Sequence, residues 1–257
     1  MLFVLVKQVP DTETKIRIKG DKSGIETNDI KWVINPYDEF AIEEALKTKD
    51  KVKAPAVTVV TLGPDRAVEA LRTALAMGVD NAIHIKTDGE TDTFTAGKAI
   101  AEVLKKEGAQ VVFAGKQAID DDQAATFGYV AEFLNWPSVS VVAKIDWDAS
   151  GTSLKAEREV EGGTRFIVQS SVPVLLAVDK GINTPRYASL PGIMKAKKKE
   201  IKSYSLADLG LSAASAKVKE SDYMPPPERA PGKKLTGDAA TQARELVKLL
   251  REEAKVI

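Results

Sequence analysis

Short, uninterrupted apolar runs recur through the first half of the chain, and each is followed by a segment with helical character. The runs are Leu2 to Val6, Ala56 to Thr61, the residues around Ile83, and Gln110 to Ala114. Such a run is typical of a strand that is buried on both faces, as in a parallel sheet. Strands that alternate with helices at this spacing predict an α/β fold with a doubly wound, mostly parallel sheet.

The residues between these runs indicate where helices begin and end. Asn35 and Pro36 suit the N-cap and the first helical position, and the acidic residues that follow suit the positive end of a helix dipole. We expect further helices over Asp65 to Met77, over Thr95 to Lys106, and in a segment that ends before Pro137.

The pattern changes after Pro137. Residues 139–147, 154–170 and 172–179 have the pattern of strands joined by short turns, and we expect them to form an antiparallel addition to the edge of the sheet. Near the N-terminus, Lys15 to Lys19 alternate and predict a half-exposed strand. Residues 181–192 are expected to form a surface loop, which a basic stretch follows.

The last part of the chain has the character of an appendage. Residues 221–234 contain three consecutive prolines and so predict an extended linker. An amphipathic helix is expected from about Asp238 to Lys255. We therefore expect an α/β domain over residues 1–209, and a linker with a helical arm that contacts a partner over residues 210–257.

Charge and cysteine content exclude several classes of function. The 257 residues include 37 basic and 37 acidic side chains, so the net charge is zero and exerts no general attraction toward nucleic acid or membranes. The chain has no cysteine, which excludes disulfides, thiolate metal sites and thiol catalysis. No apolar run approaches the ~20 residues that span a bilayer, and the N-terminal run does not fit a signal peptide. We expect a soluble, cytoplasmic bacterial protein, or a mitochondrial matrix protein if the source is eukaryotic.

Few residues could carry catalytic chemistry. His84 is the single histidine and stands within a strand pattern, which favours a structural role, and the chain has neither a nucleophile elbow nor a P-loop. Asp120, Asp121 and Asp122 form the sharpest polar cluster, between a buried strand and a helix. They could cap that helix, bind a divalent metal ion, or belong to a nucleotide-binding loop whose backbone amides face a phosphate. The third interpretation requires that amides, and not carboxylates, point at the anion.

Several longer stretches resemble one protein family. The chain contains NPYDEFAIEEAL, LRTALAMG, GKQAIDDD, FLNWP, EREVEGG and NTPRYASLPGIMKAKKK. From the first strand to about Leu209, these stretches resemble the small, beta, subunits of electron transfer flavoproteins. The resemblance implies a Rossmann-like fold of the adenine nucleotide alpha hydrolase-like kind and a heterodimer with an alpha subunit. That subunit would hold most of the FAD, which carries electrons from acyl-CoA dehydrogenases of fatty acid β-oxidation, or similar donors, to a quinone oxidoreductase.

The resemblance also implies a structural AMP in this subunit, which would have no bond-making catalysis of its own. By position, the AMP-binding residues correspond to Leu5, Asn35, Pro36, Tyr37, Asp38, Leu62, Gly115, Lys116, Gln117, Ala118, Ile119, Asp120, Asp121, Asp122, Gln123, Ala124, Ala125 and Thr126. Ala124 and Ala125 replace an amide pair that is common in the family, which leaves backbone groups and Thr126 to hold the phosphate. A flavin-bifurcating branch of the family holds a second FAD in place of AMP, but its loop usually reads IDGD where this chain has IDDD.

A partner-docking segment is implied at Arg186, Tyr187, Ala188, Ser189, Leu190, Pro191, Gly192, Ile193, Met194 and Lys195. By the resemblance, Leu190 would enter a hydrophobic pocket on the dehydrogenase. From the residues alone, the same segment could be an ordinary solvated surface. An enzyme that uses an adenine nucleotide on a similar sheet is the remaining alternative. It would need a glycine- and serine-rich loop after the first strand, where this chain has KQVPDTETK.

Overall fold

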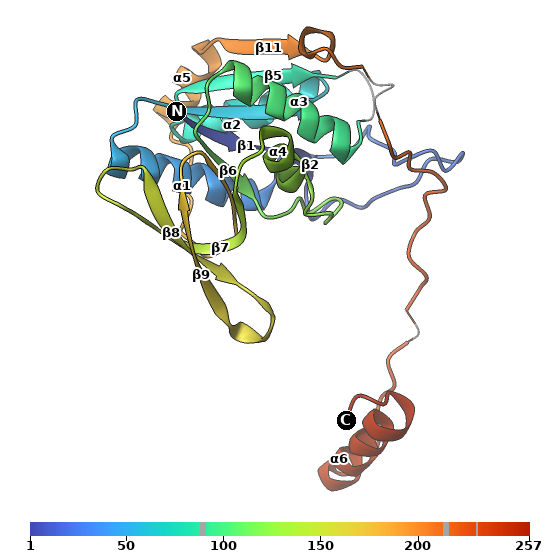
Figure 1. Ribbon diagram of the computed structural model, residues 1–257. Helices are drawn as coiled ribbons and strands as arrows, with labels where there is room; N and C mark the ends of the chain where they lie inside the picture. Colours follow the sequence, from blue (N-terminus) through green and yellow to red (C-terminus); the bar gives the residue numbers. More distant parts are fainter. Residues whose placement is uncertain (88–90, 213–215, 230) are drawn as a thin grey trace.

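The computed structural model describes residues 1–87, 91–212, 216–229 and 231–257, and within these ranges the strands form a nine-stranded sheet and a two-stranded sheet. The large sheet has the order β11-β5-β4-β1-β6-β10-β7-β8-β9 (Figure 1). The strands from β11 to β7 in this order are parallel, which confirms the predicted α/β class. Their bounds are β1 Leu2–Leu5, β4 Val57–Gly63, β5 Asn81–Lys86, β6 Val111–Gly115, β7 Ser138–Trp147, β10 Val174–Val178 and β11 Ile201–Ser205.

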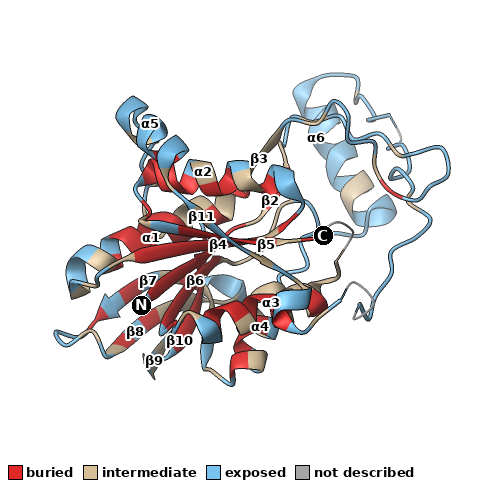
Figure 2. Cartoon of the chain, turned by 90° about the horizontal axis from the view of Figure 1, so that it is seen from above, coloured by how far each residue is buried: buried red, intermediate tan, exposed pale blue. Residues whose placement is uncertain are grey.

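Helices cover both faces of the large sheet, as a doubly wound fold requires (Figure 2). One apolar cluster lies between the sheet and α1, α2 and α5, and a second lies between the sheet and α3 and α4. The predicted helices are confirmed, and α2 ends at Gly78, which adopts a φ of 118° that favours glycine. The helices are α1 Pro36–Val52, α2 Val68–Met77 after the 3₁₀ turn Asp65–Ala67, α3 Thr93–Lys106, α4 Thr126–Leu134 and α5 Leu190–Lys198.

The antiparallel addition consists of β8, Ser153–Glu159, and β9, Arg165–Ser171, which extend the sheet beyond β7. The prediction was wrong for residues 172–179, because β10 is parallel and lies between β6 and β7. All five residues of β10 are buried apolar residues, and this is the pattern of a strand that is covered on both faces. β10 therefore belongs to the parallel core and not to its antiparallel edge.

The predicted strand from Lys15 to Lys19 is also wrong. This segment forms no named strand, and Ile18 makes only an isolated bridge to Ile25. The small sheet instead pairs β2, Gln8–Pro10, with β3, Trp32–Ile34, in an antiparallel arrangement. The alternating residues 15–18 lie in a largely exposed excursion between these two strands.

The segment after β10 is more ordered than the sequence suggested. The second part of the predicted loop and the basic stretch form α5 and β11, which pairs with β5 at the sheet edge, and the 3₁₀ turn Ala207–Leu209 follows. The C-terminal helix is confirmed as α6, Ala239–Lys248, continued by a π-helical turn, Leu249–Glu253, at the end of an extended arm (Figure 1). Residue 230 of the predicted linker lies outside the described residues, and the division at residue 209 stays a prediction. Within the described ranges, no helix has the length and apolar character needed to cross a membrane.

Candidate functional site

The carboxyl ends of β4, β1 and β6 lie side by side at one edge of the sheet, because these strands are parallel neighbours. After β1 the chain continues to β4 on one side, and it later returns to β6 on the other side. The strand order therefore reverses between β1 and β6, and ligands of open α/β sheets bind at such a switch point. Leu5, Leu62 and Gly115, three of the residues predicted to bind a nucleotide, lie at these strand ends.

Asn35 and Asp38, two buried residues at the start of α1, connect these strand ends through hydrogen bonds. The two carboxylate oxygens of Asp38 accept the backbone N–H groups of Lys7, at 2.7 Å, and of Gly115, at 3.2 Å. The Asn35 side chain donates to the Asp38 carboxylate and to the Gln117 carbonyl, each at 2.9 Å. Asn35 stands at the predicted N-cap position of α1, but its side chain caps no N–H of the described helix. Its amide is committed to the loop after β6 instead.

The carboxyl group of Asp38 is buried, and the backbone around it is closely packed. Burial raises the pKa of Asp38 from 3.8 to about 7, although the N–H donors around its carboxylate act in the opposite direction. A Cβ on Gly115 would stand 2.4 Å from an Asp38 carboxylate oxygen and 2.7 Å from the Cβ of Tyr37. The close approach of α1 to the end of β6 therefore requires glycine at position 115.

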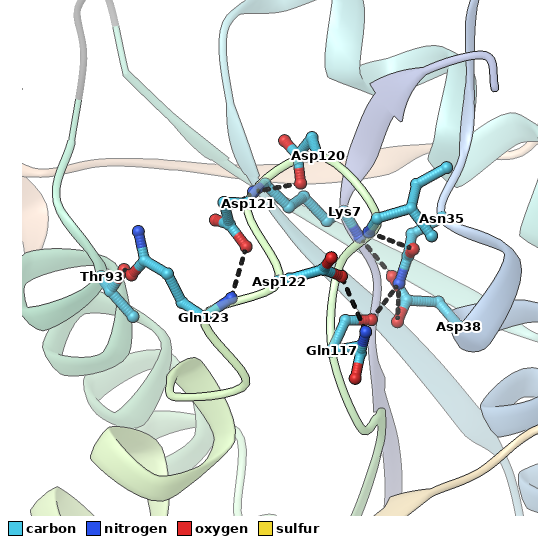
Figure 3. Close-up of polar contacts among 10 residues, drawn as sticks. Lys7, Asn35, Asp38, Thr93, Gln117, Asp120, Asp121, Asp122 and Gln123 are labelled. Carbon is cyan, nitrogen blue, oxygen red and sulfur yellow. Dashed lines mark hydrogen bonds and ion pairs between the residues drawn. The ribbon is translucent and has the colours of Figure 1, made fainter. Parts of the chain in front are cut away.

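The loop after β6 carries the three aspartates, and Figure 3 shows where their carboxylates point. Lys7, which follows β1, extends its ammonium group between Asp120 and Asp121, at 2.8 Å from each. The carboxylate of Asp122 accepts a hydrogen bond from the Gln117 side chain at 2.7 Å. Burial acts to lower the pKa of Lys7, but the two carboxylates outweigh it and hold this pKa above its ordinary value.

The aspartates do not cap the following helix, which was one interpretation of the sequence. α4 begins at Thr126, and Ala125 stands at its N-cap position. Asp122 and Ala124 have left-handed backbone angles, with φ of 50° and 49°, so the helix cannot extend back to the aspartates. Within the described residues, the backbone N–H groups of Ala124, Ala125 and Thr126 have no acceptor. These free donors form an anion-compatible part of the edge.

The other predicted nucleotide-binding residues lie around this edge, some in the apolar core and others in polar contacts. Leu5 and Leu62 belong to the apolar cluster on the side of α3 and α4. The Ile119 N–H donates to Asn35, and Gln123 accepts from Thr93. Lys116 pairs with Asp179 at 3.0 Å and lies over the Tyr37 ring, and Pro36 opens α1. Sequence reasoning missed Lys7, although a lone lysine directly after the first buried strand is a usable signal.

Other chemistry finds little support in the described part of the chain. There, no three His, Cys, Asp or Glu side chains gather as a metal site would require. The His84 ring is buried, and its Nε2 donates to the Gly63 carbonyl at 2.9 Å, as its predicted structural role requires. A hollow of about 370 Å³ lies among charged residues between Asp11 and Lys31, and none of the predicted nucleotide-binding residues lines it.

The predicted docking segment, residues 186–195, is only partly a loop. Its second half forms the start of α5, where the Ser189 hydroxyl accepts the Gly192 N–H at 3.1 Å as an N-cap. A Cβ on Gly192 would stand 2.5 Å from the Ala76 carbonyl oxygen, so α5 packs closely against the end of α2. Tyr187 is 97% exposed and Leu190 is 79% exposed, beside a hollow of about 340 Å³. The segment therefore presents apolar side chains from a backbone that is fixed in place.

Two buried glutamates of α1 hold the start of the docking segment and the residues just before it. The Glu43 carboxylate accepts from the Arg186 guanidinium at 2.7 and 2.9 Å and from the Arg186 backbone N–H at 3.2 Å. The Asn183 side chain donates to Glu44 and to the Phe40 carbonyl, each at 3.0 Å. Sequence reasoning placed these glutamates only among the acidic residues at the start of the helix, because nothing local indicates a partner about 140 residues away.

Comparisons with known proteins agree on one family. Residues 23–209 match the electron transfer flavoprotein domain. The chain is 42% identical to electron transfer flavoprotein subunit beta of Bacillus subtilis over 261 aligned residues, which cover 100% of this chain and 99% of the relative. It is 38% identical to the human subunit beta, with 95% and 97% of the two chains covered. A subunit beta of Arabidopsis thaliana that is named mitochondrial is also 38% identical, with 100% and 99% covered.

Proposed function

The chain belongs to the electron transfer flavoprotein family, and from this premise we propose that it is the beta subunit of a heterodimer that shuttles electrons. Electrons would pass from acyl-CoA dehydrogenases, or similar flavoprotein dehydrogenases, to a quinone oxidoreductase. FAD supplies this redox chemistry when it is bound, and the alpha subunit holds most of it. This chain contributes a nucleotide site, a docking segment and an arm, and it makes or breaks no substrate bond itself.

Structural AMP is the ligand that we assign to the sheet edge. The observation that carries this assignment is the buried junction of Asn35 and Asp38 with the loop from Gly115 to Thr126. It fixes the loop so that the free N–H groups of residues 124–126 can face a phosphate at the start of α4. Leu5 and Leu62 offer apolar contacts for a base at the adjacent strand ends.

The docking segment is suited to an apolar pocket with an acidic surround. Leu190 and Met194 are exposed and lie four residues apart, so they share one face of α5. Lys195, Lys197 and Lys198 follow in the last turns of the same helix. Leu190 would anchor the dehydrogenase, and the lysines would accelerate its association and make it dependent on salt.

The C-terminal arm is suited to embrace the alpha subunit. α6 has no buried residue within the described chain, yet Leu246 and Val247 are apolar and about half exposed, at 47% each. A helix with an apolar stripe in solvent needs another surface to cover it. We place the complex in the bacterial cytoplasm, or in the mitochondrial matrix if the source is eukaryotic.

Expression with and without the alpha subunit tests this function. The chain expressed alone should bind FAD weakly or not at all, because the main FAD residues belong to its partner. The co-purified heterodimer should be yellow, and a cognate dehydrogenase should reduce its flavin. A tightly bound, stoichiometric FAD in the isolated chain, or a colourless heterodimer, would contradict the proposal.

A further inference from the structure

The acidic loop poses an electrostatic problem for an anionic ligand. Asp120, Asp121 and Asp122 lie in the same loop as the free N–H groups of residues 124–126. Carboxylates near a bound phosphate repel it, and this repulsion is strong where solvent is partly excluded. Asp120 and Asp121 are only partly exposed, at 26% and 32% of their side chains, so water screens their charges incompletely.

Lys7 is placed to reduce this repulsion. Its ammonium group contacts Asp120 and Asp121 at 2.8 Å each and so links the end of β1 to the loop after β6 (Figure 3). Its backbone N–H donates to Asp38, which fixes the residue at its base. A single side chain therefore neutralises part of the acidic charge and also fixes where two of the three carboxylates point.

The neighbouring cations Lys116 and Arg66 make their direct contacts elsewhere. Lys116 is paired with Asp179 at 3.0 Å. The Arg66 guanidinium stacks on the Trp32 ring at 3.3 Å and donates to Gln8 at 2.7 Å, so its contact partners lie outside the loop. Burial lowers the pKa of Arg66, and the negative charge of Asp120 opposes this without a direct ion pair between the two described side chains.

We propose that Lys7 is a positioning residue for the nucleotide: it binds Asp120 and Asp121 so that a phosphate can reach the loop amides. This inference rests on the proposed nucleotide site and adds a specificity to it. Lys7 favours a nucleoside monophosphate over the uncharged nucleoside, since only the former carries the charge that the aspartates would repel.

Equilibrium binding of AMP and adenosine to the nucleotide-stripped heterodimer tests the proposal. Lys7→Met should weaken AMP binding by about tenfold or more and change adenosine binding by less than about threefold. Lys7→Arg keeps the charge and should stay within about threefold of wild type for both ligands. Lys144→Met is the matched control, because Lys144 also bridges two carboxylates, Asp146 at 2.7 Å and Glu157 at 3.2 Å, but does so on β7 and β8. It should change neither affinity.

Removal of the two carboxylate charges that contact Lys7 provides the decisive comparison. In the triple variant Lys7→Met, Asp120→Asn, Asp121→Asn, AMP binding should recover to within about threefold of wild type. Equal losses for AMP and adenosine in Lys7→Met, without recovery in the triple variant, would show a merely structural lysine and overturn the inference. Unchanged AMP binding in Lys7→Met would overturn it as well. A wild-type heterodimer that binds neither ligand would instead overturn the proposed nucleotide site itself.

Discussion

At the proposed nucleotide site the polar side chains are already paired within the chain, whereas the proposed docking segment leaves its largest apolar side chains in solvent. Asp38 is 5% exposed and is surrounded by N–H donors, while Tyr187 is 97% exposed and Leu190 is 79% exposed. The first arrangement leaves little to reorganise when a small ligand binds. The second leaves apolar area exposed, as expected of a surface that a partner covers.

Both regions are nevertheless attached to the same helix. Asn35 and Asp38 lie at the start of α1, and Glu43 and Glu44 lie within the following turns of the same helix. The helix therefore fixes the proposed nucleotide site at its end and the proposed docking segment along its side. The difference between the regions lies in what each leaves unsatisfied: backbone amides at the first, and apolar side chains at the second.

The largest expected effect is the dependence of stability on pH, which arises from Asp38 at the proposed nucleotide site. Because burial raises the pKa of Asp38 from 3.8 to about 7, the folded chain holds a proton that the unfolded chain releases near pH 4. The contribution of this proton to the free energy of unfolding is complete below about pH 4. It is lost as the pH rises through about 7, at up to about 1.4 kcal/mol per pH unit. Urea unfolding of the nucleotide-free full chain should show this slope. Asp38→Asn should flatten it, and parallel curves for the two proteins would contradict the expectation.

Leu190→Ala should affect docking and leave the nucleotide edge unchanged. A buried apolar anchor is typically worth ~2–4 kcal/mol, so the apparent affinity for a cognate dehydrogenase should fall by roughly 30-fold or more. Steady-state electron transfer measures this affinity, and the flavin spectrum and AMP content should stay the same. Ile167→Ala is a control of similar exposure, 72%, on the β8–β9 hairpin, and it should have no effect. An unchanged affinity in Leu190→Ala would remove residues 186–195 as the docking site.

Gly115→Ala should act first on the proposed nucleotide site. The added Cβ would stand 2.4 Å from an Asp38 oxygen and 2.9 Å from the Tyr37 backbone, so α1 must shift. Overpacking of this kind costs ~1–3 kcal/mol of stability, and we expect AMP binding to weaken as well. Gly20→Ala meets no atom within 4 Å and serves as the control in thermal unfolding and AMP binding. Equal thermal stability and equal AMP affinity of the two variants would mean that the contact between α1 and the end of β6 has room for a Cβ.

The smallest expected effect concerns the cap of α5. Ser189→Ala removes the acceptor of the Gly192 N–H and should cost ~1 kcal/mol of helix stability, which weakens docking about fivefold. Ser189→Asp retains a capping oxygen and should restore docking to near the wild-type level. If both variants dock equally weakly, the hydroxyl contacts the partner and does not act as a cap.

Local patterns predicted the parallel core of the fold well. The apolar runs that became β1, β4, β5 and β6, and the helices after them, depend on short-range periodicity and end signals. β10 was assigned to the wrong kind of pairing because a strand does not encode its neighbours. Residues 15–19 alternate as a strand would, but no partner strand covers them in the described structure.

The candidate site was only partly visible in the sequence. The loop with Asp120 to Asp122 was identified, but the role of its carboxylates depends on Lys7, which lies 113 residues before Asp120 in the chain. The left-handed angles at Asp122 and Ala124 keep the helix from reaching the aspartates, and at Ala124 the residue type gave no signal of this conformation. The pairing of Glu43 with Arg186 spans 143 residues and leaves no local signal.

The nucleotide content of the purified heterodimer tests the account most directly. The complex is denatured, and the released nucleotides are separated and quantified against the protein. A site built around the junction of Asn35, Asp38 and the loop from Gly115 to Thr126 should release one AMP, together with one FAD held mainly by the alpha subunit. Two FAD and no AMP per heterodimer would contradict the assignment and place the protein in the flavin-bifurcating branch of the family.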